Sequence, residues 1–235
     1  MKRVIVCEDE ESIRSFVVIS LKYNGYEVVE APTGEDAIHA YEELTNSGKD
    51  VDIMLLDVML PGINGFEVCK QIREMDKEVG IIMLTARSQD SEKVEGLKDG
   101  ADDYITKPFQ LDVFLARVES VYRRVSMIRS RHNGDLSSGT FVLDSHAIKL
   151  RNNDKVYDLT QLEFLILQTF FENPDKVFSR TELLNKVWGP NYEDTDGGKK
   201  LVDVALRRLR VKIEEDPSQP MHICNKRGEG FYWVP

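Results

Sequence analysis

Short apolar runs alternate with amphipathic stretches through the first half of the chain. The apolar runs occupy residues 4–7, 26–29, 53–56, 81–84 and 104–105. Between them, apolar residues recur at helical spacing, as Ile13, Phe16, Val17 and Leu21 do. Because near-continuous apolar strands alternate with helices, we expect a parallel sheet covered by helices on both faces. The pattern therefore predicts a doubly wound α/β domain with five strands.

The pattern changes after residue 124. Residues 125–135 are polar and include an Asn-Gly pair, which predicts a linker between a domain of residues 1–124 and a domain of residues 136–235. In the second domain, strand-like runs at residues 140–143, 147–150 and 155–158 precede two helices. Each helix starts with a capping box, Thr160 with Glu163 and Ser179 with Glu182. A long helix over residues 199–215 and a C-terminal hairpin complete the domain.

Charge separates the two halves further. The 235 residues include 31 Lys or Arg and 41 Asp or Glu, which gives a formal net charge of -10. Residues 1–124 hold 15 basic and 25 acidic residues, whereas residues 125–235 hold 16 of each. The cysteines, Cys7, Cys69 and Cys224, have neither disulfide nor zinc spacing, and no apolar run is long enough to span a bilayer. We therefore expect a cytoplasmic protein whose halves have different partners.

Reactive side chains follow the first-half strands at the point where each strand ends. Asp9 follows the first run, Asp57 the third, Thr85 the fourth and Lys107 the fifth. Ligands bind beyond the carboxyl ends of strands in open parallel sheets, so these side chains should converge. Two carboxylates about 4 Å apart repel by roughly 4 kcal/mol at an effective dielectric of 20. A Mg²⁺ ion and the Lys107 ammonium would offset that repulsion, and Asp57 could then attack a phosphoryl group.

Four segments resemble the receiver domain of bacterial two-component response regulators, and the resemblance extends over essentially all of residues 1–124. They are VIVCEDE, IMLLDVMLPGINGFEV, IIMLTAR and GADDYITKPF. The resemblance implies the sheet order 2-1-3-4-5, with Asp57 as the phospho-acceptor. It also implies four ligands for Mg²⁺, namely the carboxylates of Glu8, Asp9 and Asp57 and the backbone carbonyl of Met59. Lys107 would bind the phosphate and precede a cis peptide bond to Pro108, and Thr85 and Tyr104 would form the switch. Glu8 stands where the family often has aspartate.

The helix expected over residues 199–215 has an apolar and a basic face. Val202, Ala205, Leu206, Leu209 and Ile213 fall on one side at helical spacing, which predicts the buried face. Six basic residues against one acid between residues 199 and 212 suit the major groove of DNA. A solvated basic face is the alternative for such a helix taken alone. The residues expected to face DNA are Lys200, Val204, Arg207, Arg208 and Arg210 on the helix and Arg227 in the hairpin turn.

Three segments of the second half resemble the winged-helix domain of OmpR/PhoB-type response regulators. They are LTQLEFLILQTFFENPDKVFSRTELLNKVWG, VDVALRRLRVKIEEDP and KRGEGFYW. The resemblance implies that residues 199–215 form the recognition helix, that the hairpin is the wing, and that residues 189–198 face RNA polymerase. The whole chain is thus expected to be a phosphorylation-dependent transcription regulator and not an enzyme. Its partners would be a sensor histidine kinase, RNA polymerase and tandem half-sites on double-stranded DNA.

The same resemblance implies that phosphorylation joins two receiver domains through a symmetric face. The candidate residues of that face are Lys93, Asp99, Asp102, Asp103, Arg117 and Arg124. Val113 stands where the family usually has an acid, so Lys93 lacks its usual partner, for which Asp112 is a poor substitute. Each exposed ion pair of this kind contributes about 0–1 kcal/mol.

Two other functions stay open on the sequence. One is a phosphorylation-independent regulator that acts as a constitutive dimer, and its mass in solution would not respond to a phosphate mimic with Mg²⁺. The other is a Mg²⁺-dependent α/β enzyme with a nucleic-acid-binding appendage. Against the enzyme, the first half has no GxGxxG or P-loop motif. Met59 also stands two residues after Asp57, where a hydrolase would need a second acid.

Overall fold

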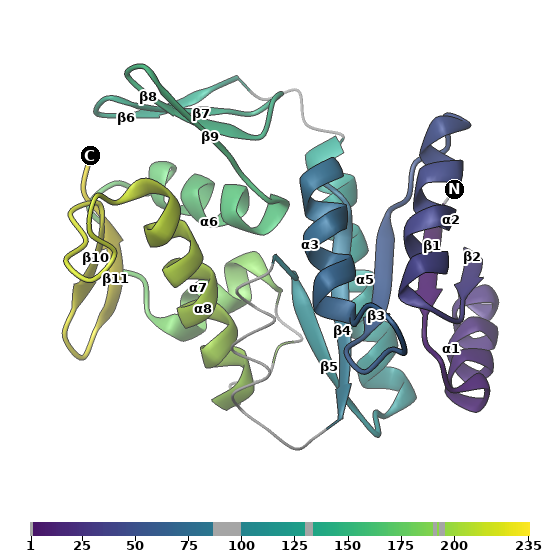
Figure 1. Ribbon diagram of the computed structural model, residues 1–235. Helices are drawn as coiled ribbons and strands as arrows, with labels where there is room; N and C mark the ends of the chain where they lie inside the picture. The colour runs from purple at the N-terminus through teal and green to yellow at the C-terminus, as the bar shows by residue number, and fades with distance from the viewer. Residues whose placement is uncertain (1, 87–99, 130–133, 190–191, 193–195) are drawn as a thin grey trace. The chain divides into compact units, whose positions relative to one another are not determined.

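The computed structural model describes residues 2–86, 100–129, 134–189, 192 and 196–235 (Figure 1). The chain divides into two compact units, residues 1–126 and 127–235. Helix α5 runs over Leu111–Arg129, so the first residues of the predicted linker are helical. The reason is that Val118, Val121 and Val125 are all buried and continue the apolar face of the helix past residue 124. None of the described helices is both long and apolar enough to cross a lipid bilayer.

The first unit contains a five-stranded parallel sheet in the order β2-β1-β3-β4-β5, as predicted (Figure 1). The strands are β1 (Lys2–Cys7), β2 (Tyr26–Ala31), β3 (Ile53–Asp57), β4 (Gly80–Ala86) and β5 (Asp103–Lys107). Every residue of β3 is buried. Burial on both faces explains why the β3 sequence is apolar up to Asp57 and does not alternate.

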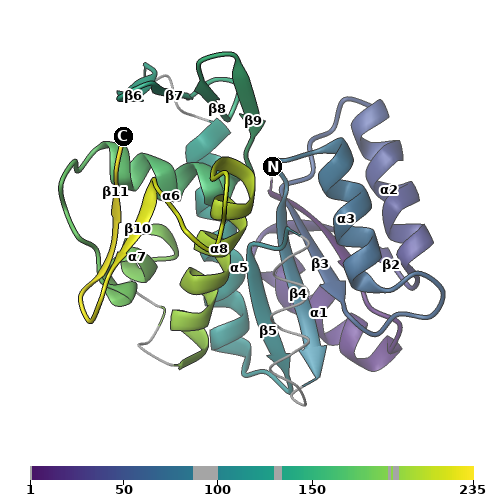
Figure 2. The ribbon, with the colours of Figure 1, turned by 60° about the vertical axis from the view of Figure 1, so that its left-hand side comes forward.

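Helices cover both faces of this sheet (Figure 2). Among the described residues these helices are α1 (Glu11–Tyr23), α2 (Gly34–Asn46), α3 (Gly65–Met75) and α5. The α1 residue Leu21 and the α5 residue Phe114 share a core cluster with Val4 and Leu55 of the central strands, so α1 and α5 lie on one face. Helices α2 and α3 contact each other on the opposite face (Figure 2). The site at the sheet edge therefore has a rigid, two-sided support.

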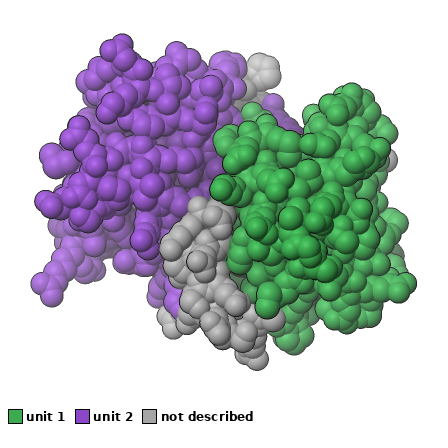
Figure 3. Space-filling model, viewed as in Figure 1, with its two compact units in different colours: residues 1–126 green, residues 127–235 purple. Residues whose placement is uncertain are grey.

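The second unit comprises residues 127–235, which are purple in Figure 3. A four-stranded antiparallel sheet comes first, with β6 (Leu136–Ser138), β7 (Phe141–Asp144), β8 (Lys149–Asn152) and β9 (Lys155–Asp158). Three helices follow, α6 (Gln161–Phe171), α7 (Arg180–Val187) and α8 (Asp196–Ile213). The chain closes with the hairpin of β10 (Ile223–Lys226) and β11 (Gly230–Trp233). This order is that of a winged helix, and both predicted capping boxes are present.

The hairpin is anchored to the segment before α7. Phe178 and Phe231 exchange two backbone hydrogen bonds of 2.8 Å each. Gly230, directly before Phe231, has φ 151°, and a Cβ there would lie 2.0 Å from the carbonyl oxygen of Phe178. Only glycine permits this close approach of two backbones. Gly230 therefore fixes the position of the hairpin beside the start of α7.

Candidate functional site

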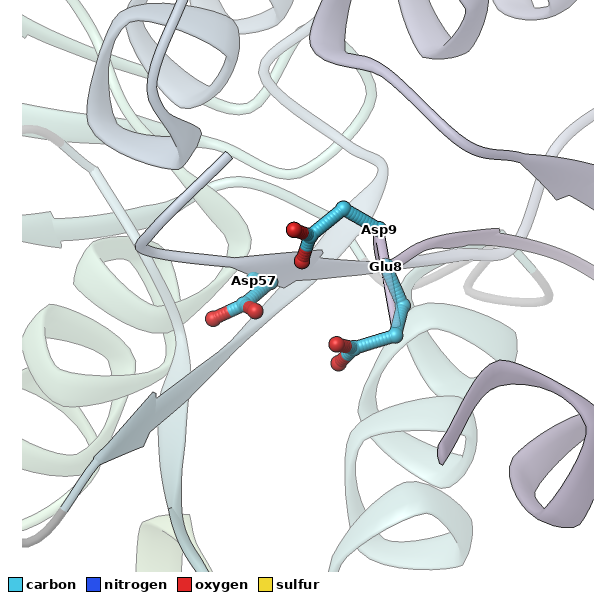
Figure 4. Close-up of side chains that lie close together, drawn as sticks. All are labelled: Glu8, Asp9 and Asp57. Carbon is cyan, nitrogen blue, oxygen red and sulfur yellow. The ribbon is translucent and has the colours of Figure 1, made fainter. Parts of the chain in front are cut away.

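Three carboxylates meet where β1 and β3 end (Figure 4). Asp57 is the last residue of β3, and Glu8 and Asp9 directly follow β1. Ligand oxygens of all three lie within 4.8 Å of one another. The two strands pair in parallel with Cys7 opposite Leu56, so their next residues emerge side by side. The expected convergence of these acids at one edge of the sheet is thus observed.

Lys107, the last residue of β5, reaches the two buried carboxylates. Its Nζ donates to Oδ2 of Asp57 at 2.7 Å and lies 2.5 Å from Oε2 of Glu8. Glu8 is 0% and Asp57 5% exposed, whereas Asp9 is exposed. Two buried carboxylates without a counter-charge would be strongly destabilising, so the ammonium is part of what permits their burial.

Burial and neighbouring charges also shift the protonation of this pair. Burial raises the pKa of Glu8 to about 7, because the hydrogen bond from Lys107 only partly opposes it and the Asp57 charge adds to it. Burial by itself would lower the pKa of Lys107, but its hydrogen bonds to Asp57 and Glu8 outweigh that effect and raise the pKa. The site therefore keeps its ammonium charged, and a further cation would favour the ionised form of Glu8.

The donor atoms of the acidic cluster suit a hard divalent cation. All three side chains are carboxylates, and Mg²⁺ prefers oxygen ligands in proteins. The backbone N–H of Met59 donates to Oδ1 of Asp57 at 3.2 Å, which holds the loop after β3 beside the carboxylate. The residues present therefore fit a Mg²⁺ ion, whereas the Met59 carbonyl as a further ligand stays a prediction.

The start of α3 is pressed against the backbone of Asp57. A Cβ on Gly65 would lie 2.1 Å from the carbonyl oxygen of Asp57. Asn64 caps the helix by accepting hydrogen bonds from the N–H groups of Phe66 and Glu67. Because glycine alone allows this contact, Gly65 lets the start of α3 pack directly against the backbone of Asp57 at the end of β3.

Thr85 and Tyr104 lie on the two strands beyond β3. Thr85 is 3% exposed and pairs in register with Thr106, one residue past the position opposite Asp57. Tyr104 is 8% exposed on β5. The expected cis peptide bond between Lys107 and Pro108 is present. Thr85 and Tyr104 thus lie on β4 and β5, on the same side of β3. Their roles as a switch stay predictions.

One residue of the site was missed by the sequence reasoning. Arg14 of α1 donates through Nη1 to the carbonyl oxygens of Glu8 at 2.8 Å and Asp9 at 3.2 Å, and its Nε lies 3.7 Å from Glu30. It therefore braces the backbone that carries two of the three acids. The sequence signal for this contact was the position of Arg14, five residues after Asp9 and in the first turn of a predicted helix, from which its side chain can reach back to the preceding loop.

The basic face of α8 is narrower than the sequence predicted. Arg207 and Lys200 are exposed on the helix, and Arg227 is exposed after β10. The predicted contact of Val204 with DNA stays a prediction. The apolar face predicted for this helix is confirmed, because Val202, Ala205, Leu206, Leu209 and Ile213 are all buried.

Arg208 and Arg210 both contact neighbours within the second unit, and their predicted DNA contacts stay predictions. Arg208 is 8% exposed, and its Nε lies 3.5 Å from Oε1 of the fully buried Glu163. Lys212 reaches the other oxygen of Glu163 at 2.5 Å. Burial alone would raise the pKa of Glu163, but the charges of Arg208 and Lys212 lower it. Arg210 donates to the carbonyl oxygen of Ile223 and is half-buried. These arginines hold α8 to its neighbours.

The candidate residues of a receiver dimer fall into three groups. Lys93 and Asp99 lie outside the described residues. Asp102 is buried and lies 2.6 Å from the guanidinium of Arg73, so it is not the surface residue that the prediction required. Arg124 donates to the hydroxyl of Ser120 at 3.4 Å, and its place in a dimer face stays a prediction. Asp103 lies 2.9 Å from Arg117. Val113, by contrast, is 47% exposed. In the described part of this face, Val113 is exposed, and Asp103 forms an ion pair with Arg117 of the same chain.

Both units are similar to known protein families. Residues 4–119 match the response regulator receiver domain, and residues 154–233 match the transcriptional regulatory protein C-terminal domain. Among solved structures, DrrB of Thermotoga maritima, described as an OmpR/PhoB homologue, is 31% identical over 100% of both chains with a TM-score of 0.49. A mutant of RitR is 24% identical, with 100% of this chain and 99% of that chain covered and a TM-score of 0.77, which supports the fold alone. A receiver domain protein from Clostridium thermocellum is 21% identical over 55% of this chain and 99% of its own, with a TM-score of 0.50.

Proposed function

The chain belongs to the OmpR/PhoB family of two-component response regulators, which are phosphorylation-regulated transcription factors, and from that premise we propose that Asp57 is the phospho-acceptor. The observation that carries the proposal is the cluster of Asp57, Glu8 and Asp9 with the ammonium of Lys107. A sensor histidine kinase would supply the phosphoryl group, with a reactive carboxylate as its target.

The reaction follows from the side chains around Asp57. An Asp57 oxygen forms a bond to phosphorus while the bond from phosphorus to the donor nitrogen breaks, and the leaving imidazole takes a proton. Lys107 donates to Oδ2 of Asp57, so its ammonium would stabilise the charge that builds up on the transferring oxygens. Thr85 would donate a hydrogen bond to the phosphoryl group once it is bound. Tyr104 would then repack on β5.

The acids beside Asp57 would hold Mg²⁺. Glu8, Asp9, Asp57 and the carbonyl of Met59 are the proposed ligands. When bound, the ion supplies positive charge to the phosphoryl oxygens, which is most of what phosphoryl transfer requires. These residues bring the transferring oxygens and the acceptor carboxylate together.

An apolar hollow beside Lys107 offers a place for the donor. A cavity of about 220 Å³ is lined by Ser12, Ile13, Phe16, Lys107, Pro108 and Phe109. Phe16 is 45% and Ile19 67% exposed on the adjoining turns of α1. We assign this hollow to a helix of the kinase, because the donor histidine must reach the neighbouring Asp57.

The second unit would bind DNA through α8 and the wing. Lys200 and Arg207 on α8 and Arg227 after β10 are exposed basic residues suited to phosphates and base edges. Phosphorylated receivers would pair, which would place two winged helices on tandem half-sites about one helical turn, roughly 34–36 Å, apart. RNA polymerase would be contacted by the loop before α8, most of which lies outside the described residues.

The test of the acceptor is phosphorylation by acetyl phosphate with Mg²⁺. The wild-type chain should acquire one label that is cleaved by hydroxylamine, as an acyl phosphate is, and Asp57→Asn should acquire none. Asp52→Asn is the control, because Asp52 lies just before the other end of β3. An equal label on Asp57→Asn, stable to acid, would refute the assignment. An unchanged mass in solution after labelling would favour the constitutive dimer.

A further inference from the structure

Two residues one helical turn apart hold the hairpin to α8. Glu214, directly after α8, is 8% exposed although it is an acid. Its carboxylate accepts hydrogen bonds from three successive backbone N–H groups, those of Met221 at 2.9 Å, His222 at 3.0 Å and Ile223 at 2.7 Å. A carboxylate that satisfies a row of N–H groups makes strong, charge-assisted bonds and fixes the backbone that carries them.

Arg210 holds the other side of the same residue. Its Nε and Nη2 donate to the carbonyl oxygen of Ile223 at 3.0 and 2.7 Å. Ile223 is the first residue of β10 and is 0% exposed. Both backbone groups of one buried residue are therefore tied to α8, at the point where the hairpin begins.

We propose that Arg210 and Glu214 are positioning residues, which set the place of the wing relative to α8 and so act in DNA binding without touching DNA. Residue Arg227, at the tip of the hairpin, follows the end of β10 at Lys226. The inference rests on the proposed DNA contacts of α8 and Arg227. Because α8 and the wing would engage one duplex together, their combined affinity depends on their spacing.

Electrostatics and positioning predict opposite signs for the removal of Glu214. Loss of an acid from a DNA-binding surface strengthens the attraction to phosphates. Loss of an acid that positions the wing weakens binding. The next residue, Glu215, is exposed and carries the same charge, so Glu215→Gln is a matched control for Glu214→Gln.

The experiment is a double-mutant cycle with the full chain. The probe is a fluorescein-labelled duplex that the wild-type chain selects from a random-sequence library. We expect Glu214→Gln to weaken binding about fivefold or more, as loss of one contact worth about 1 kcal/mol does. Glu215→Gln should leave binding unchanged or strengthen it. On the Arg227→Ala background, Glu214→Gln should cost less than about twofold, because the wing no longer contributes.

Fluorescence of the two tryptophans checks the fold, since Trp188 and Trp233 both lie in the second unit. If Glu214→Gln unfolds that unit, Arg210→Lys replaces it in the cycle, because lysine keeps the charge of a phosphate contact but not the pair of bonds to one carbonyl. Equal binding by Glu214→Gln and Glu215→Gln would overturn the proposal. So would full additivity with Arg227→Ala, or an Arg227→Ala variant that binds like the wild type. A wild-type chain that selects no duplex would refute DNA binding itself and the inference with it.

Discussion

Nζ of Lys107 lies 2.5 Å from Oε2 of Glu8, a side chain with no exposed surface, and 2.7 Å from Oδ2 of Asp57. One ammonium thus serves two buried carboxylates that come from different strands. It joins the ends of β1, β3 and β5 electrostatically, and Mg²⁺ bound to the same acids would offset part of the charge that its removal leaves unbalanced.

The variant Lys107→Met tests this arrangement. We expect the rate of phosphorylation by acetyl phosphate to fall about 10²-fold, as when one preorganised charge donor is removed from a reaction site. The initial rate with saturating Mg²⁺ is the measurement. Lys70→Met removes an exposed lysine of α3 and should keep the wild-type rate. Equal rates for the two variants would show that Lys107 does not act on the transferring group.

Arg14 should matter for the metal although it would not touch it. Arg14→Met removes the donor to the carbonyl oxygens of Glu8 and Asp9, and we expect Mg²⁺ to bind about tenfold more weakly, as when other outer supports of metal ligands are lost. Calorimetric titration with Mg²⁺ measures the affinity. Lys22→Met, on the same helix and 3.9 Å from Glu30, is the control. An Arg14→Met chain with unchanged Mg²⁺ affinity would limit Arg14 to a structural role.

Two neighbouring arginines of α8 should behave differently. Arg207→Ala should weaken DNA binding and reduce the log–log salt slope by about 0.9, the contribution of one phosphate, without changing stability. Arg208→Ala should instead destabilise the second unit by about 2 kcal/mol, because it removes one of the two cations beside the buried Glu163. Gel shifts at several salt concentrations and urea unfolding followed by tryptophan fluorescence separate the two effects. A stable Arg208→Ala chain with a reduced salt slope would return Arg208 to the DNA-facing group.

Glu163 gives the second unit a defined response to acid. Its pKa is lower in the folded chain than the usual value of about 4.3, so below that pH the unfolded chain binds more protons. The stabilising effect is therefore complete above the usual pKa and is lost as the pH falls through the folded pKa. Urea midpoints from tryptophan fluorescence should drop between about pH 6 and about pH 3. Glu163→Gln should be less stable at neutral pH and show a smaller drop.

The acidic cluster was predictable from the sequence because the place of a residue after a strand determines the edge of the sheet at which it lies. In a parallel sheet, residues that follow neighbouring strands emerge at one edge, so the positions of Asp9, Asp57 and Lys107 after their apolar runs determined their convergence. The order of the strands came from the resemblance, and the register of β1 on β3 then fixed which residues are adjacent.

The buried charges were not predictable in the same way. Arg208 and Glu163 are far apart in the sequence, and a helical wheel shows the direction of a side chain but not the element that packs against it. The same holds for Arg73 and Asp102, which pair across 29 positions. Sequence alone therefore predicts that a basic residue on a helix is exposed, because it does not show which buried acid the residue pairs with.

Gly65 places a limit on how this chain can vary. Because a methyl group there would overlap the Asp57 carbonyl at 2.1 Å, even alanine is excluded unless the acceptor strand itself shifts. A library randomised at this codon and screened for signalling should return glycine alone, whereas the exposed codon of Lys70 should tolerate many replacements. The absence of a side chain at Gly65 is in this sense as strictly required by the backbone of Asp57 as any side chain of the cluster.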